Sequence, residues 1–196
     1  MDAATESLHA PRGSGMDPDG PGLPVRMPAE SRWRPRRPVY RSTKTYDHSE
    51  GLSCCFRQWR AVDSHCRLVH GYALAFRFVF ATDELDERNW CFDFGGLKPV
   101  RSWLHDMFDH TMVVAEDDPH LPDFRSLAEK GLLALRVMPH VGCEATAKYV
   151  FDHVARFVAD QTAGRVWLET VEVREHGGNS AVYEHVPAPA RTHGAR

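Results

Sequence analysis

The pattern of apolar and polar positions predicts two extended stretches early in the folded part of the chain, at about residues 44–60 and 70–81. In the second stretch, alternate residues from Tyr72 to Phe80 are aromatic or aliphatic, which is typical of a strand with one face against a core. His70 shares that parity. A polar turn follows, so the strand is expected to end near Ala81.

A first main helix is predicted where apolar residues recur at helical spacing behind the turn-forming Gly95 and Gly96. Its apolar face consists of Leu97, Val100, Leu104 and Phe108. Asp109 and His110 then fall at the end of this helix. Two polar, chemically active side chains therefore follow directly on an apolar face.

The segment between the two main helices is less regular. Residues 111–124 are predicted to be an irregular linker. A short helix ending near Gly131 and a strand at 133–138 are expected to follow.

A second main helix is predicted at residues 143–160, with Glu144 in its first turn, where a carboxylate suits the helix dipole. Its apolar face consists of Ala147, Val150, Phe151, Val154 and Val158. Two alternating stretches, 165–176 and 179–186, close the chain as strands joined by a glycine-rich turn. The order of strands, helix, helix and strands predicts an α+β fold with helices layered on an antiparallel sheet.

Length and composition are consistent with one soluble domain. The chain has 196 residues, 42% of them hydrophobic, which is enough for a substantial core. Its five cysteines lack the even number of a secreted disulfide framework, so reduced thiols in a cytoplasm are expected. No apolar run reaches the roughly 18 residues that span a bilayer, and the first thirty residues lack the apolar stretch of a signal peptide. We therefore expect a cytoplasmic protein that does not enter a membrane.

The first 41 residues differ from the rest in composition. They carry seven prolines and seven arginines with almost no hydrophobic periodicity, so they cannot bury enough apolar surface to offset the entropy of ordering. We predict a disordered tail at 1–41, a folded domain at 42–187 and a flexible C-terminus at 188–196. The arginine cluster in the tail could contact nucleic acid, but acidic residues outnumber basic ones after residue 41, so no nucleic acid is expected to bind the domain. A translation start assigned too far upstream would explain the tail equally well.

The stretch SHCRLVHGY, residues 64–72, concentrates chemically active side chains at the start of a predicted strand. Cys66, four residues before His70, could supply a thiolate base beside an imidazole, or His70 could be one ligand of a metal. Both could equally be structural. Cysteine is often a small buried hydrophobe, and a lone histidine beside a strand is often only hydrogen bonded.

Two further positions offer carboxylates. Asp109 adjoins His110, and a carboxylate next to an imidazole can fix its tautomer and raise its basicity. Glu175 has the parity of Val171 and Val173, so it ends a core-facing row where a carboxylate needs partners. A ligand with two parallel N–H donors, such as a guanidinium or an aminopyrimidinone ring, would be one partner. Alternatively, Glu175 turns out to solvent.

Five motifs in order resemble those of the family of 6-pyruvoyl-tetrahydropterin synthases and 6-carboxytetrahydropterin synthases, over about Tyr46 to Glu184. They are CRLVHGY for Cys-x-x-x-His-Gly-His, FDFGGLK for Asp-Phe-x-x-Leu-Lys, FDH for Asp-His, CEATAKYV for the start of the second helix, and EHGGNSAVY for a Glu followed eight residues later by Tyr. The resemblance implies the tunnelling fold, in which antiparallel ββααββ units join their sheets into a barrel. It also implies homo-oligomers, usually trimers paired into hexamers, with active sites at subunit interfaces.

The resemblance further implies roles for individual residues. Cys66 would be the general base, with Asp109 and His110 as its relay. Glu175 would anchor the ring of a pterin substrate by paired hydrogen bonds. Further substrate contacts are expected from Glu144 and Arg60, with Lys98 and Arg77 as weaker candidates for the triphosphate.

Zinc is the cofactor of the family, and here the sequence departs from the pattern. The family uses one histidine in Phe-x-Ala-Ala-His and two in His-Gly-His. In this chain FRQWR is interpreted as placing Arg60 at the first position, Tyr72 replaces the last, and only His70 remains. A catalytic zinc normally has three protein ligands. Either other residues complete the set, with His65 the best candidate, or the metal is lost and the guanidinium of Arg60 polarises the substrate hydroxyls or binds a phosphate in its place. Weaker candidates for ligands are His48 and Cys55.

The function implied by the resemblance is a 6-carboxytetrahydropterin synthase-like lyase that converts 7,8-dihydroneopterin triphosphate in 7-deazaguanine and queuosine biosynthesis. One alternative is a 6-pyruvoyl-tetrahydropterin synthase-type enzyme, which eliminates triphosphate. A second is a pterin-binding protein without turnover, because the zinc ligands are replaced. A third is a structural oligomer with no affinity for pterins.

Overall fold

The computed structural model describes residues 39–185. The predicted tail, except for its last three residues, and the predicted flexible C-terminus at 188–196 lie outside the described residues. The first strand begins at Tyr40, two residues before the predicted start of the domain. Arg41 belongs to this strand and forms a two-pronged ion pair with Glu169, at 2.5 and 2.6 Å.

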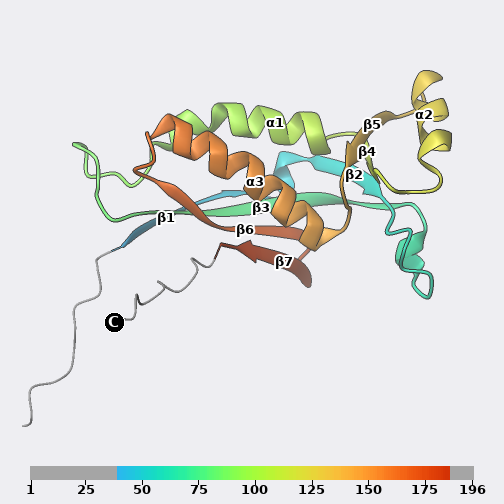
Figure 1. The fold of residues 1–196 in the computed structure, drawn as a ribbon, viewed down its shortest axis with the longest axis horizontal. Coiled ribbons are helices and arrows are strands. Elements are labelled where there is room, and N and C mark those ends of the chain that lie inside the picture. The colour runs from blue at the N-terminus through green and yellow to red at the C-terminus, as the bar shows by residue number, and fades with distance from the viewer. Residues whose placement is uncertain (1–38, 186–196) are drawn as a thin grey trace, which may run out of the picture. The chain divides into compact units, whose positions relative to one another are not determined.

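The described residues form one mixed sheet of seven strands (Figure 1). The strands are β1 (Tyr40–Tyr46), β2 (Leu52–Phe56), β3 (His70–Thr82), β4 (Thr111–Ala115), β5 (Ala134–Met138), β6 (Trp167–His176) and β7 (Asn179–Glu184). β3 is the longest strand, and both of its edges are paired. β2 and β1 follow one another along one edge, while β6 pairs with the other edge and carries β7.

Two parts of the sheet differ from the prediction. The extended stretch predicted at 44–60 is two strands, because Asp47 caps a 3-10 turn, η1 (His48–Glu50), that separates β1 from β2. The linker predicted at 111–124 contains β4, which is buried throughout and pairs in parallel with both β2 and β5. Strands buried on both faces read as continuous apolar runs, so the alternation rule does not detect them.

Three α-helices complete the described part of the chain. They are α1 (Lys98–Phe108), α2 (Leu121–Glu129) and α3 (Cys143–Gln161). α1 and α3 cover the same face of the sheet (Figure 1), and the indole of Trp103 on α1 stacks on the imidazole of His153 on α3 at 3.8 Å. None of the helices within residues 39–185 is long and apolar enough to cross a membrane.

The core lies between this face of the sheet and the two long helices. Phe76, Phe78 and Phe80 of β3 are completely buried there, as their shared parity predicts. The predicted apolar faces of both main helices are buried against them. The α+β fold class expected from the sequence is therefore confirmed, with a parallel β2–β4–β5 unit added to an otherwise antiparallel sheet.

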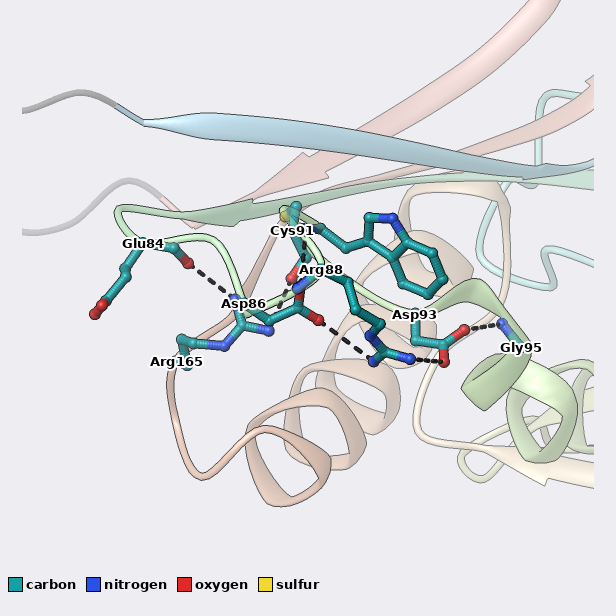
Figure 2. A network of polar contacts seen from close by, with 8 residues as sticks. Glu84, Asp86, Arg88, Cys91, Asp93, Gly95 and Arg165 are labelled. Atoms are coloured by element: carbon teal, nitrogen blue, oxygen red, sulfur yellow. Dashed lines mark hydrogen bonds and ion pairs between the residues drawn. The ribbon is translucent and has the colours of Figure 1, made fainter.

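The FDFGGLK motif has a structural role at the entry to α1. Asp93 caps the 3-10 turn η3 (Phe94–Leu97) by accepting the N–H of Gly95 at 2.8 Å, and Figure 2 shows this contact. The guanidinium of Arg88 bridges Asp93 and Asp86, at 3.5 and 3.4 Å. The motif therefore fixes the loop that starts α1.

Candidate functional site

Four rings meet where β2, β3 and β6 come together. Phe56, the last residue of β2, lies across from His70, the first residue of β3, with ring centroids 4.8 Å apart. The ring of Tyr72 is 5.8 Å from His70 and 5.8 Å from His176 at the end of β6. We refer to Phe56, His70, Tyr72 and His176 as the aromatic cluster.

The register of β2 and β3 offers a second interpretation of the position predicted for Arg60. The position across from His70 belongs to Phe56, and Arg60 follows four residues later, after β2 has ended. Leu52-Ser53-Cys54-Cys55-Phe56 fits the family pattern Phe-x-Ala-Ala-His, with an apolar first residue, two small residues and phenylalanine in place of histidine. In the sequence, the alternation of Leu52, Cys54 and Phe56 indicates a strand, but its register against β3 is not visible there.

The half-buried Cys66 lies in η2 (His65–Arg67), just before β3. Its carbonyl accepts the N–H of Gln58 at 2.8 Å, which places it beside the end of β2. Three other cysteines are poor bases, because burial raises the pKa of Cys54 to about 12, that of Cys143 to about 11, and that of Cys91 in the same direction. Cys66 is partly exposed and does not belong to this buried set.

Glu175 lies close to the start of α3. The pKa of Cys143, the first residue of α3, is raised by burial and then by the negative charges of Glu175 and Glu144, so the three side chains are neighbours. The thiol of Cys143 also donates to the carbonyl of Val173 at 3.4 Å. Glu175 is half-buried and Glu144 is exposed. Two predicted substrate-binding carboxylates thus face the same corner of the fold.

Gly142 joins this corner to the Cys66 side. Its φ of 108° is strained for any residue with a side chain, and a Cβ there would collide with the side chain of Gln58. The backbone N–H of Gln58 also donates to the carbonyl of Cys66. The turn before α3 therefore packs directly on the segment that carries Cys66.

Asp109 and His110 form a hydrogen-bonded pair at the end of α1. The Nδ1 atom of His110 lies 2.5 Å from Asp109 Oδ1, and Nδ1 of His105 lies 3.2 Å from Oδ2. These two hydrogen bonds, that of His110 first, hold the pKa of Asp109 below its ordinary value. His105 also contacts Glu50 at 3.5 Å, and Glu50 in turn is paired with Arg101 at 2.8 Å. The predicted relay pair is therefore part of a longer chain of charged groups.

This relay pair and Cys66 lie at opposite ends of β2. The N–H of His110 donates to Ser53 at the start of the strand, whereas Cys66 contacts Gln58 beyond its end. Five residues at about 3.3 Å each separate the two contact points by about 17 Å when the chain is extended. The side chain of His110 is 89% exposed. One chain therefore does not bring His110 and Cys66 within hydrogen-bonding distance.

Arg60 lies beside a separate cavity of about 350 Å³ at the carboxyl ends of the parallel strands β2, β4 and β5. Its guanidinium lies over the ring of Trp59 and pairs with Asp117 at 2.5 Å. Trp59 also donates to Asp117, at 3.0 Å. The predicted substrate contact of Arg60 remains a prediction, and Asp117 is a partner that the sequence did not reveal.

The residues present do not fit a catalytic zinc. Phe56 has no donor atom, and the phenol of Tyr72 would have to lose its proton before it could bind a metal well. Within residues 39–185 no three His, Cys, Asp or Glu side chains are arranged to hold a metal ion. The predicted ligand His65 is exposed in η2 and does not complete a set of three with His70.

The fold can be compared with solved structures. An uncharacterised protein from Wolinella succinogenes aligns with a TM-score of 0.64 at 18% identity, covering 76% of this chain and 99% of that one. A 6-pyruvoyl tetrahydropterin synthase from Plasmodium falciparum aligns with a TM-score of 0.57 at 12% identity, covering 75% and 98%. These neighbours and the sheet with its two covering helices define a tunnelling-fold protein.

The sequence comparisons identify the family within this fold class. The model of the 6-pyruvoyl tetrahydropterin synthase family matches residues 45–186. The 6-carboxy-5,6,7,8-tetrahydropterin synthase of Aquifex aeolicus is 25% identical over 150 residues, which cover 74% of this chain and 89% of that protein. The chain belongs to the 6-pyruvoyl tetrahydropterin synthase family.

Proposed function

We propose that the protein is a lyase of the 6-carboxytetrahydropterin synthase type, which converts 7,8-dihydroneopterin triphosphate in 7-deazaguanine and queuosine biosynthesis. The observation that carries this proposal is the turn before α3, which is joined to β6, the strand of Glu175, by the Cys143–Val173 hydrogen bond and packs on Gln58, whose N–H bonds Cys66. The similarity to the Aquifex aeolicus enzyme supports the choice of product.

In this proposal each residue has one task. Glu175 accepts paired hydrogen bonds from the N3–H and the 2-amino group of the pterin ring and so fixes its orientation. The Cys66 thiolate removes a proton from the side chain of the substrate, and an imidazole supported by a carboxylate returns a proton. The Asp109–His110 pair supplies that imidazole.

The relay pair comes from a second subunit, because the backbone contacts of Cys66 and His110 lie about 17 Å apart along the segment of β2 in one chain. The exposure of His110 makes it available to a neighbouring copy. We therefore propose a homo-oligomer, a trimer or hexamer, with its active sites at subunit interfaces. The five cysteines are all free, which is consistent with the cytoplasmic location that we also propose.

A second candidate function is pterin binding without turnover. It is favoured by Phe56 and Tyr72, which occupy positions where the family pattern has zinc ligands. In that case the protein would retain the contacts of Glu175 while lacking the electrophile that activates the substrate side chain.

Mass spectrometry of the products formed from 7,8-dihydroneopterin triphosphate tests the proposal. We expect 6-carboxytetrahydropterin, and we expect Cys66→Ala to abolish its formation. Release of triphosphate with 6-pyruvoyl-tetrahydropterin would instead identify the other branch of the family. Unchanged substrate together with measurable pterin binding would favour the second candidate function.

A further inference from the structure

The aromatic cluster occupies the place where three metal ligands are expected in this family. Phe56 lies across from His70 in the register of β2 and β3, and Tyr72 follows two residues later on the same face of β3. The three ring centroids lie 4.8, 5.8 and 6.3 Å apart, so the side chains contact one another. The three ligand positions are therefore filled by packed rings, of which only His70 is an imidazole.

The hydrogen bonds of the cluster define which atoms remain for a ligand. Nδ1 of His70 lies 2.8 Å from the carbonyl of Leu68, so it carries the proton and the lone pair of Nε2 is left to accept. Nδ1 of His176 accepts the N–H of Gly178 at 3.1 Å, which leaves Nε2 as the protonated nitrogen of a neutral ring. Within residues 39–185 the hydroxyl of Tyr72 makes no hydrogen bond. The cluster thus offers one imidazole acceptor, His70 Nε2, and two donors, the phenol of Tyr72 and the Nε2–H of His176.

The geometry points to a site that holds its ligand without a metal ion, with His70 Nε2 and the hydroxyl of Tyr72 making hydrogen bonds where coordination is expected. Phe56 is 5% exposed and supplies the apolar floor of the cluster. A pterin side chain, with its hydroxyl groups, has the matching donors and acceptors. That choice of ligand rests on the proposed function, whereas the absence of metal binding does not.

Zinc titration of the full-length oligomer tests this inference independently of any reaction. We expect less than about one zinc per ten chains after expression with added zinc, and no binding in calorimetry at micromolar concentrations, since one imidazole supplies only a third of the usual ligands. Stoichiometric zinc in the wild-type protein would overturn the inference. Loss of that zinc in His70→Ala would then place the metal at the cluster.

A variant that restores the ligands tests the placement of the cluster. Phe56→His combined with Tyr72→His should bind about one zinc per chain, and adding His70→Ala should remove it. The matched control, Phe56→Leu with Tyr72→Phe, changes the same positions without adding donors and should stay free of zinc. Melting temperature and oligomer size establish that each variant is folded. A folded double-histidine variant that binds no zinc would show that these positions do not form a ligand set, and would overturn the inference. If that variant does not fold, the zinc content of the wild-type protein still decides the question.

Discussion

Mixed oligomers of two inactive variants test whether the active site is shared between subunits. Cys66 and His110 contact Gln58, beyond the end of β2, and Ser53, near its start, and these two points lie about 17 Å apart. A substrate proton moves between groups that are roughly 3 Å apart, so one chain cannot use both residues on one substrate atom. Cys66→Ala and His110→Ala should each be inactive when they are assembled alone.

Random assembly of the two variants in equal amounts should restore activity in part. A shared site works only if its Cys66 comes from a chain with an intact thiol and its His110 from a chain with an intact imidazole. Each condition is met half of the time, so about one quarter of the sites should be active in a symmetric ring. Specific activity should therefore rise from the background of the parents to about a quarter of the wild-type value.

Wild type mixed with the double variant Cys66→Ala/His110→Ala is the matched control. Shared sites need two wild-type chains, so about one quarter should be active, whereas sites built within one chain would leave about one half. The assay is the rate of product formation from 7,8-dihydroneopterin triphosphate after co-refolding of equimolar chains. Complementing mixtures that stay at the background of the parents, together with a control at one half, would refute the shared site.

Three further predictions concern single side chains. The carboxylate of Asp118 is fully buried and lies 2.9 Å from the partly buried guanidinium of Arg57. Asp118→Asn removes this counter-charge and should lower the free energy of unfolding, measured by urea titration, by about 3 kcal/mol. The control Asp117→Asn breaks an exposed pair and should lower it by less than about 1 kcal/mol. Glu175→Gln should weaken pterin binding at least tenfold, measured by fluorescence, with an unchanged melting temperature; unchanged affinity would remove Glu175 from the site. Burial lowers the pKa of His153 in the folded state, so its contribution to stability is complete above the ordinary pKa of about 6.5 and is lost as the pH falls below it. The stability of His153→Phe relative to the wild type should therefore rise as the pH is lowered from about 8 to about 5. A difference that does not change with pH would contradict this assignment.

The elements that could be predicted from the sequence are those whose large apolar side chains recur on one face. α1 and α3 each bury one face against the core, and β3 keeps its large side chains at one parity although the small residues between them are also mostly buried, so the apolar residues of all three recur with the period of a strand or a helix. β4 is buried on both faces, and its run of five residues has no period to detect. The break between β1 and β2 depends on the Asp47 cap and on Gly51, whose φ of 74° requires glycine, and such local turns are weak signals in a long polar stretch.

The candidate site was predictable where neighbours in sequence are neighbours in space. The contact between Asp109 and His110 follows from their adjacency, and the structure adds His105 one helical turn earlier. The place of Phe56 across from His70 depends instead on the register between β2 and β3. The interpretation from the sequence alone placed Arg60 at the first histidine position of the family pattern. Register is set by pairing along the whole strand, so a shift of a few residues is invisible in a short motif.

The aromatic cluster also explains how the end of the sheet can keep its shape with so few metal-binding atoms. A metal ion bound between β2 and β3 would contribute folding free energy by joining the two strand ends. Here Phe56 is buried against His70 and Tyr72, and burial of a phenylalanine side chain is worth about 1.5–3 kcal/mol. The hydrogen bond from His70 to Leu68 fixes the imidazole without any metal. Packing can therefore hold the strand ends that position Cys66 and Glu175, and the chemistry of the site can change while its scaffold remains.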